Sequence, residues 1–239
     1  MPAAASGRLV DPVAVAAAIT AVTTRIDELA AGRDIRLIAV TKGFGVDAID
    51  AAVRAGCTAI GENYAQELRP KIAAVAPDLP PPEVHFIGQL QTNKVRLIAS
   101  IVDVWQTVDR PSLVAEIARR AAGARVFVQV DMTGEEGKGG CSPEQTEPLV
   151  DACRTAGLDV CGLMTVGPTS ADPQRTADAF AATRALADRL SLVGCSMGMS
   201  GDYELAIAHG ATHVRIGSAL FGARPTTAHS DQIAWRQEG

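Results

Sequence analysis

Lys42 is the residue whose position in this chain is most suggestive of covalent chemistry. It ends the apolar run LIAVTK, which is typical of a buried strand. A lysine at a strand end often extends its ammonium group into solvent. In a partly enclosed site, however, desolvation lowers the lysine pKa, and the neutral amine becomes nucleophilic towards a carbonyl. Lys42 is therefore a candidate for Schiff-base formation, and it is one of only four lysines in the chain.

Two segments late in the chain have the composition of phosphate-binding loops. CSMGMSGDYELAIAHG places Ser200 and Gly201 at the start of an expected helix, and RIGSALFG places Gly217 and Ser218 at the start of another. Small residues allow a ligand to approach the backbone closely, and N–H groups at a helix start favour anions. Helix capping by Ser200 is the simpler alternative. Two such loops in succession favour a phosphate site.

Arg215 lies two residues before Gly217, so strand alternation places both on the same face. A guanidinium group only donates hydrogen bonds. Directed at the ring nitrogen of a bound heterocycle, Arg215 would keep that nitrogen unprotonated. The alternative is a buried ion pair with Asp131 or Glu62, and the residues alone favour that alternative.

These residues fall within a regular alternation of strand and helix patterns. An opening helix is expected over 12–31, with Asp11 as its cap and Pro12 at its first position. Eight apolar runs then predict strands at 36–42, 58–63, 84–90, 102–108, 125–131, 160–166, 191–197 and 212–219. Helical patterns, such as 46–56 and 64–75, separate most neighbours. This alternation predicts a parallel sheet.

Eight units without a linker predict a single (β/α)₈ TIM-type barrel that takes up the whole chain, residues 1–239. Only a short polar tail follows Phe221. Because barrel sites lie at the carboxyl ends of the strands, the polar strand-end residues are expected to converge there. These are Lys42, Glu62, Asn63, Gln89, Thr107–Arg110, Asp131, Thr165, Ser196, Ser200 and Arg215–Ser218.

The composition argues against several classes of protein. The net charge is −5 with no basic stripe, which argues against a nucleic-acid partner. No apolar run is long enough to span a membrane, and no charged segment precedes an apolar one at the N-terminus. Five scattered cysteines without a CxxC pair indicate a reducing, cytoplasmic environment. His209 and His213 lack acidic or thiol co-ligands, so no metal site is expected.

Along nearly its whole length, the sequence resembles the pyridoxal phosphate homeostasis proteins (the YggS/PROSC family). The motifs that carry the resemblance occur in the family order with matching gaps. They are LIAVTK, GENYAQEL, HFIGQLQTNK, QTVD, GLMTVGP, SMGMSGDYELAI and VRIGSALFGAR. The resemblance implies a barrel of the alanine racemase N-terminal type that carries pyridoxal 5′-phosphate on a lysine.

The resemblance also implies roles for individual residues. Lys42 matches the lysine that anchors the cofactor, and Arg215 matches the arginine facing the pyridine nitrogen. Ser200, Gly217 and Ser218 match phosphate-contacting positions, and Asn63 and His85 fall at the cofactor mouth. Lys138 matches a loop lysine associated with cofactor transfer, although a solvated loop lysine is an equal alternative. Lys94 belongs to the same signature and receives no role.

The resemblance implies a carrier or buffer acting in vitamin B6 and amino-acid homeostasis, with apo-enzymes as candidate recipients. Racemases of this fold need a second acid/base group opposite the lysine, supplied with the help of a further domain. No such domain is expected here. The exposed cofactor face favours a monomer, with a dimer as the alternative.

Two rival functions remain open at this point. The first is a weak, racemase-like enzyme in which Lys42 acts as the base. The second is a dinucleotide-binding domain, because Gly43-x-Gly45-x-x-Ala48 follows a strand and Glu62 ends the next one. Eight strand units and the late phosphate-type loops argue against the second function.

Overall fold

Eight parallel strands form a closed barrel in the computed structural model, which describes residues 9–170 and 172–223. The strands are β1 Arg36–Val40, β2 Ala59–Glu62, β3 Glu83–Phe86, β4 Val104–Val108, β5 Arg125–Gln129, β6 Asp159–Met164, β7 Gly194–Ser196 and β8 His213–Ile216. Each strand pairs with the next one in the sequence, and β8 pairs with β1. The predicted TIM-type barrel is confirmed. Because the sheet is closed, it is not the open, doubly wound sheet of the dinucleotide-binding alternative.

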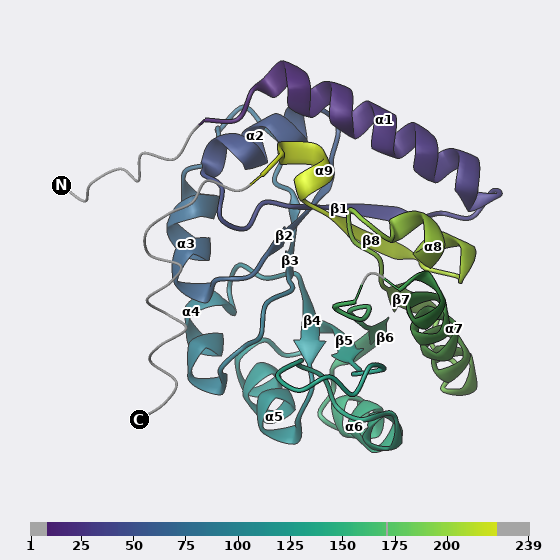
Figure 1. The fold of residues 1–239 in the computed structure, drawn as a ribbon. Coiled ribbons are helices and arrows are strands. Elements are labelled where there is room, and N and C mark those ends of the chain that lie inside the picture. The colour runs from purple at the N-terminus through teal and green to yellow at the C-terminus, as the bar shows by residue number, and fades with distance from the viewer. Residues whose placement is uncertain (1–8, 171, 224–239) are drawn as a thin grey trace.

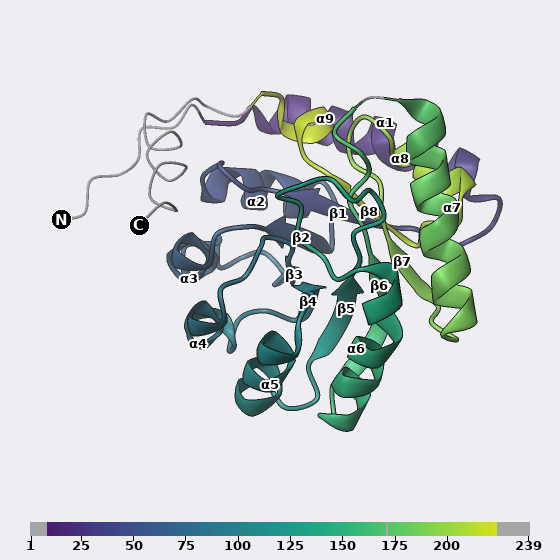
Figure 2. The same ribbon diagram turned by 60° about the horizontal axis from the view of Figure 1, so that its bottom comes forward.

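Helices surround the barrel on its outside (Figure 1). They are α1 Pro12–Ala30, α2 Val46–Arg54, α3 Ala65–Ala73, η1 Thr92–Lys94, α4 Val95–Ile98, α5 Pro111–Arg120, α6 Pro143–Thr155, α7 Pro173–Arg189, α8 Tyr203–Ala208 and α9 Ser218–Phe221. Helix α1 precedes the first strand and packs against α2, α8 and α9 (Figure 2). It therefore covers the place where β8 meets β1.

Local sequence signals set where several helices begin. Asp11 accepts a hydrogen bond from the backbone N–H of Val13, and Pro12 occupies the first helical position, as predicted. Asp172 caps α7 in the same way. Ser142 and Gln145 form a capping box at the start of α6. These caps satisfy N–H groups that have no partner within their helix.

Side chains of the strands alternate between two separate cores. A large cluster fills the layer between the strands and the helices, and includes Trp105, Leu163 and Ile216. A much smaller cluster of Val104, Phe127 and Met164 lies apart from it. Because strand residues two apart share a face, the small cluster belongs to the barrel interior. The apolar packing inside the barrel is therefore limited, which leaves room there for polar side chains.

Several predicted strands extend further in the sequence than in the structure. The run 36–42 becomes a strand over Arg36–Val40, and the run 84–90 becomes Glu83–Phe86. The chain stays apolar beyond these strand ends because residues such as Ile87 line a cavity there. Hydropathy alone does not distinguish a strand end from an apolar cavity wall.

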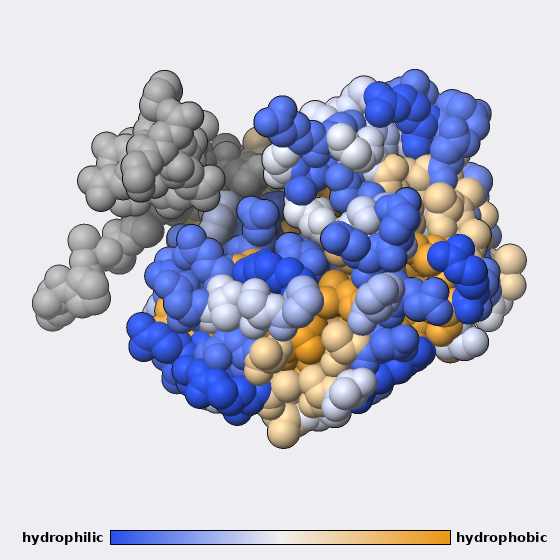
Figure 3. Space-filling view, turned by 90° about the horizontal axis from the view of Figure 1, so that it is seen from below, coloured by the Kyte–Doolittle hydropathy of each residue, from blue (hydrophilic) through white to orange (hydrophobic). Residues whose placement is uncertain are grey.

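The face seen in Figure 3 exposes hydrophobic residues near its centre, between strongly hydrophilic ones. Such mixed surfaces are normal for folded proteins. No helix in the described part of the chain is long and apolar enough to cross a membrane. Of the five cysteines, all free thiols, Cys57, Cys141, Cys153 and Cys195 are buried. They pack as small hydrophobic residues.

Phe127 provides a test of the small interior core. Its side chain is 1% exposed and contacts the ring of His213 edge-on at a centroid distance of 5.0 Å. We expect Phe127→Ala to lower the free energy of unfolding by about 3–5 kcal/mol, because little else can fill the cavity. Urea denaturation measures this loss. Phe127→Leu is the control and should cost clearly less; equal losses would contradict a packed interior.

Candidate functional site

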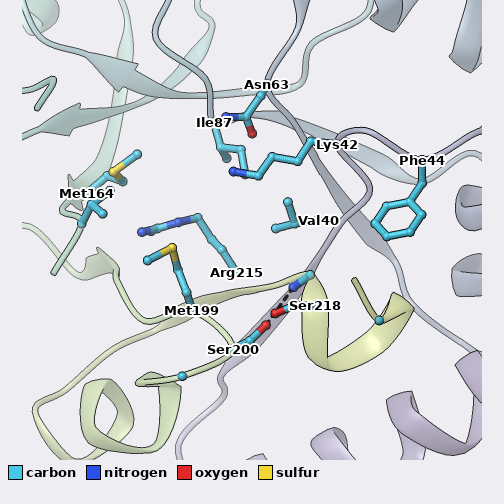
Figure 4. A pocket seen from close by; sticks show the side chains of 14 residues that line it. Val40, Lys42, Phe44, Asn63, Ile87, Met164, Met199, Ser200, Arg215 and Ser218 are labelled. Atoms are coloured by element: carbon cyan, nitrogen blue, oxygen red, sulfur yellow. Dashed lines mark hydrogen bonds between the residues drawn. The ribbon is translucent and has the colours of Figure 1, made fainter. Parts of the chain in front are cut away.

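The carboxyl ends of the strands surround a cavity of about 420 Å³ (Figure 4). This volume is within the usual range for small-molecule sites. The lining residues are Val40, Lys42, Phe44, Asn63, Ile87, Met164, Val166, Met199, Ser200, Gly201, Arg215, Gly217, Ser218 and Gly222. Six of the seven site residues predicted from the sequence are in this set, and His85 is not.

Lys42 lies two residues beyond the end of β1 and is half-buried. Its amine points into the same space as the Arg215 guanidinium (Figure 4). The chain turns sharply just after the lysine, where Gly43 has a φ of 76° and Phe44 N–H donates to the Thr41 carbonyl. Glycine adopts this left-handed conformation without the usual penalty. The turn therefore leaves the Lys42 side chain at the mouth of the barrel.

A buried ion pair holds the segment that carries Lys42. Lys71 Nζ on α3 lies 2.5 Å from Glu62 Oε1 and donates to the Thr41 carbonyl at 2.7 Å. The Thr41 hydroxyl donates to the same Glu62 oxygen at 2.6 Å. Glu62 is fully buried. The pair thus ties α3 and β2 to the residue that precedes Lys42. Sequence reasoning missed Lys71, although it is one of only four lysines.

Asn63 follows β2 and lies on the cavity wall (Figure 4). Its Oδ1 atom is buried and lacks a hydrogen-bond partner among the described residues. The loop is held close to the next one, because a Cβ on Gly88 would come within 2.2 Å of the Asn63 carbonyl oxygen. A buried acceptor without a partner is costly unless a ligand satisfies it. Asn63 therefore presents an acceptor to the cavity.

Ser200 and Ser218 lie together at one end of the cavity (Figure 4). The Ser200 hydroxyl oxygen accepts from the backbone N–H groups of Gly217 at 3.3 Å and Ala219 at 3.2 Å. The two loops predicted to bind phosphate, after β7 and β8, are thus brought together. They present hydroxyl and backbone N–H donors at one place.

Arg215 is 4% exposed, and its guanidinium faces the cavity (Figure 4). Its Nη1 donates to the Ser196 hydroxyl and its Nη2 to the Thr165 carbonyl, both at 2.7 Å. Burial lowers the pKa of Arg215 to about 10, so the side chain remains a cation at neutral pH.

The alternative of an ion pair between Arg215 and Asp131 or Glu62 is wrong. Glu62 pairs with Lys71, and Asp131 accepts from Thr133. Both carboxylates are thus engaged with other side chains, Glu62 with Lys71 on α3 and Asp131 with Thr133 in its own loop. The described hydrogen bonds of Arg215 go to neutral oxygens instead.

The expectation that His85 lies at the mouth is not met. His85 is 1% exposed in the barrel interior, where its Nε2 lies 2.7 Å from Glu83 Oε1 and its Nδ1 lies 2.7 Å from Gln106 Nε2. Glu83 begins β3, so the ring is directed towards the amino ends of the strands. The HFIG motif places His85 on β3, but it does not show whether the ring lies at the mouth of the barrel or deep inside it.

The two other signature lysines lie outside the cavity lining. Lys138 Nζ donates to the Gly167 carbonyl at 2.6 Å and pairs with Glu135 at 2.9 Å. Glu135 in turn accepts from the Thr169 hydroxyl. Lys138 therefore joins the loops after β5 and β6, and is not simply a solvated loop lysine. Lys94 ends the short helix η1 and is half-buried.

The remaining cavity wall is apolar, with Ile87, Met164 and Met199 among its members. Among the described lining residues, Lys42 and Arg215 alone carry ionisable side chains. Across residues 9–170 and 172–223, no group of three or more His, Cys, Asp and Glu side chains is arranged to hold a metal ion. The chemistry available at the wall is thus that of one amine and one guanidinium.

Residues 16–225 match the family model of the alanine racemase N-terminal domain. A pyridoxal phosphate homeostasis protein of Deinococcus radiodurans is 42% identical over 204 residues, which are 81% of this chain and 93% of that one. The corresponding protein of Pseudomonas aeruginosa is 42% identical over 218 residues, covering 86% and 94% of the two chains. The chain belongs to the pyridoxal phosphate homeostasis protein family.

Solved structures support the same family assignment. PipY of Synechococcus elongatus with PLP bound is 29% identical with a TM-score of 0.77, and the match covers 87% of this chain and all of that one. Alanine racemase of Bartonella henselae has a TM-score of 0.71 at 16% identity, over 92% of this chain and 62% of that one. At this low identity, the similarity to alanine racemase shows a shared fold and nothing more.

The Lys71–Glu62 pair gives a prediction about stability. Lys71→Met leaves the Glu62 carboxylate buried without its cation, and we expect the free energy of unfolding to fall by about 3–5 kcal/mol. Denaturant unfolding measures the loss. The double variant Lys71→Met/Glu62→Leu should recover much of it, because both charges are then removed.

The matched control is Arg54→Met, which removes a surface ion pair with Asp78. Solvent-exposed pairs contribute little. A loss for Arg54→Met as large as that for Lys71→Met would refute a special role for the buried pair.

Proposed function

We propose that the cavity binds pyridoxal 5′-phosphate and that Lys42 holds it as a Schiff base. The observation that carries the proposal is the convergence of the Lys42 amine, the Arg215 guanidinium and the two serine loops on one cavity. When bound, the cofactor would supply an aldehyde for the amine and an electron-withdrawing ring. The solved structure of PipY with PLP bound supports this choice of ligand.

The serine end of the cavity suits the phosphate group. The N–H groups of Gly217 and Ala219 already donate to one oxygen, the Ser200 hydroxyl. Backbone N–H groups of this kind, with the hydroxyls of Ser200 and Ser218, are the donors that a phosphate accepts. Barrel proteins often bind phosphate in these same loops, after the seventh and eighth strands.

The other end suits the ring. Arg215 can donate to the pyridine nitrogen but cannot accept a proton from it. The ring nitrogen would therefore stay unprotonated, which weakens its ability to withdraw electrons. Asn63 would offer its unsatisfied Oδ1 to a donor of the bound molecule.

We infer that the protein acts as a carrier or buffer of the cofactor in vitamin B6 and amino-acid homeostasis. A racemase needs an acid/base group opposite its lysine. The described cavity lining offers only Lys42 and Arg215 as ionisable groups, and Arg215 remains protonated at neutral pH. The whole chain would serve as one cofactor-binding domain in the cytoplasm, as a monomer or dimer, with apo-enzymes as recipients.

The Schiff base can be tested by borohydride reduction followed by mass spectrometry. We expect a pyridoxyl adduct on the peptide containing Lys42, and its loss in Lys42→Ala, because the reduced bond is covalent and specific. Lys138→Ala is the control, since its amine is engaged with Gly167 and Glu135, and it should keep the adduct. An adduct on a different lysine would overturn the assignment.

Hydrogen exchange at Cα distinguishes the carrier from a racemase-like enzyme. We expect the protein loaded with pyridoxal phosphate to exchange the Cα proton of L-alanine in deuterated water no faster than free pyridoxal phosphate does. The reason is that Arg215 would leave the ring nitrogen unprotonated, so the bound ring would withdraw electrons only weakly when the Cα proton leaves. NMR of the amino acid measures the exchange. Fast exchange that disappears in Lys42→Ala would establish the enzyme instead.

A further inference from the structure

A continuous series of hydrogen bonds runs through the interior of the barrel to Arg215. Arg215 Nη1 donates to the Ser196 hydroxyl at 2.7 Å, and this hydroxyl donates to Gln106 Oε1 at 2.6 Å. Gln106 Nε2 lies 2.7 Å from His85 Nδ1, and His85 Nε2 lies 2.7 Å from Glu83 Oε1. We call these residues, from Arg215 to Glu83, the interior chain.

The interior chain connects opposite ends of the barrel. Its upper end, Arg215, lines the cavity. Its lower end, Glu83, begins β3 and pairs with Arg36 and Arg125, which begin β1 and β5. The side chains of these two arginines are 42% and 43% exposed. The interior chain therefore extends from the cavity to a charged, solvent-exposed cluster at the amino ends of the strands.

The three intermediate members are almost completely removed from solvent. Ser196 and Gln106 are fully buried and His85 is 1% exposed. A buried polar group is costly unless it is hydrogen-bonded, so breaking one link leaves its neighbour unsatisfied. Hydrogen bonds in series also polarise one another in a medium of low dielectric constant.

The donors and acceptors are consistent in only one direction. The Ser196 hydroxyl donates to the carbonyl oxygen of Gln106, so the amide nitrogen of Gln106 faces His85 and donates to Nδ1. His85 must then carry its proton on Nε2, which donates to the Glu83 carboxylate. The interior chain of hydrogen bonds thus requires a neutral His85 ring that carries its proton on Nε2.

The surroundings of His85 favour the neutral form. Burial lowers its pKa and outweighs the opposing attraction of Glu83, while the positive charges of Arg36 and Arg125 lower it further. Among the described residues, His213 on β8 also faces His85, with its ring centroid 6.3 Å away. Burial lowers the pKa of His213 to about 4, so that ring is neutral as well.

We propose that Ser196, Gln106 and His85 are positioning residues that hold Arg215 in place for a ligand through the interior chain. Ser196 occupies Nη1, and the Thr165 carbonyl occupies Nη2. These two bonds fix the plane of the guanidinium. If the chain breaks at Gln106, the Ser196 hydroxyl can turn, and Arg215 loses one of its two fixed contacts.

The first test asks in which direction the hydrogen bonds of the interior chain run in the ligand-free protein. We expect the ¹⁵N chemical shifts of His85 to report a neutral ring protonated on Nε2 between about pH 6 and pH 8, the range in which histidines usually titrate. A ring that is charged, or protonated on Nδ1, in this range would overturn the proposal. This measurement does not depend on the proposed function.

The second test measures pyridoxal phosphate binding in Ser196→Ala and Gln106→Leu. It rests on the proposed function, because it takes pyridoxal phosphate as the ligand. We expect the dissociation constant to rise on the order of tenfold, as for the loss of a hydrogen bond to a charged group. The visible absorption maximum of the loaded protein should shift in the same direction as in Arg215→Met.

The matched control is Thr183→Val, which removes a fully buried hydroxyl that donates to the Ala179 carbonyl in α7, away from the chain. This variant should keep the affinity and spectrum of the parent. Parent-like affinity and spectra in Ser196→Ala and Gln106→Leu would overturn the proposal. If the parent protein fails to bind pyridoxal phosphate, the proposed function fails, and the His85 measurement still decides the direction of the chain.

A double-mutant cycle tests whether Gln106 acts through Arg215. In the Arg215→Met background, Gln106→Leu should weaken binding no further, because the group that it positions is gone. Independent, multiplicative losses would show that Gln106 affects binding by general loosening of the barrel, and would overturn the proposal.

Discussion

The pairing of β8 with β1 is the constraint on which the site depends. It places Ile38 opposite Arg215 and Ala39 opposite Ile216, across more than two thirds of the chain. Lys42 follows shortly after the first strand of this pair, and the Gly217 loop follows directly after the second. Closure of the barrel therefore brings the amine, the guanidinium and the serine loops to one mouth. Helix α1 covers this seam from outside through its contacts with α2, α8 and α9.

The two faces of the strands near Lys42 perform different tasks. On the outer side, Glu62 and Lys71 form a buried ion pair that holds Thr41. On the inner side, Lys42 and Arg215 face the cavity. Thr41 and Lys42, which follow β1 directly, turn to these two different sides, so anchoring and binding are divided between neighbouring residues. The ion pair behind the strand thus fixes the residue next to Lys42, whose own side chain lines the cavity.

The barrel interior differs from the all-aliphatic filling that is common in this fold. Besides apolar side chains such as Phe127 and Ile38, the polar residues Gln106, Ser196 and His85 are buried in the interior of the described barrel. Polar side chains in such a place must satisfy one another, which leaves them little freedom to change direction. The centre of the barrel is thus an extension of the site, and Arg215 is its end at the cavity.

The sequence by itself determined the order of the elements, the barrel and most of the mouth. The apolar runs located all eight strands, and the polar residues at their ends included Lys42, Asn63, Ser200 and Arg215, since barrel topology brings strand ends together wherever they lie in the sequence. Periodicity also placed Arg215 and Gly217 on one face.

Only the tertiary structure decided which partners these residues have. The sequence favoured an ion pair for Arg215 and placed His85 at the mouth, whereas Arg215 bonds to Ser196 and His85 lies deep in the barrel. Depth within a barrel depends on register between strands, and Lys71 reaches Glu62 through the packing of α3. Local spacing in the sequence encodes neither the depth of His85 nor the contact of Lys71 with Glu62. Both arise only when strands distant in the sequence pair and the helices pack over them.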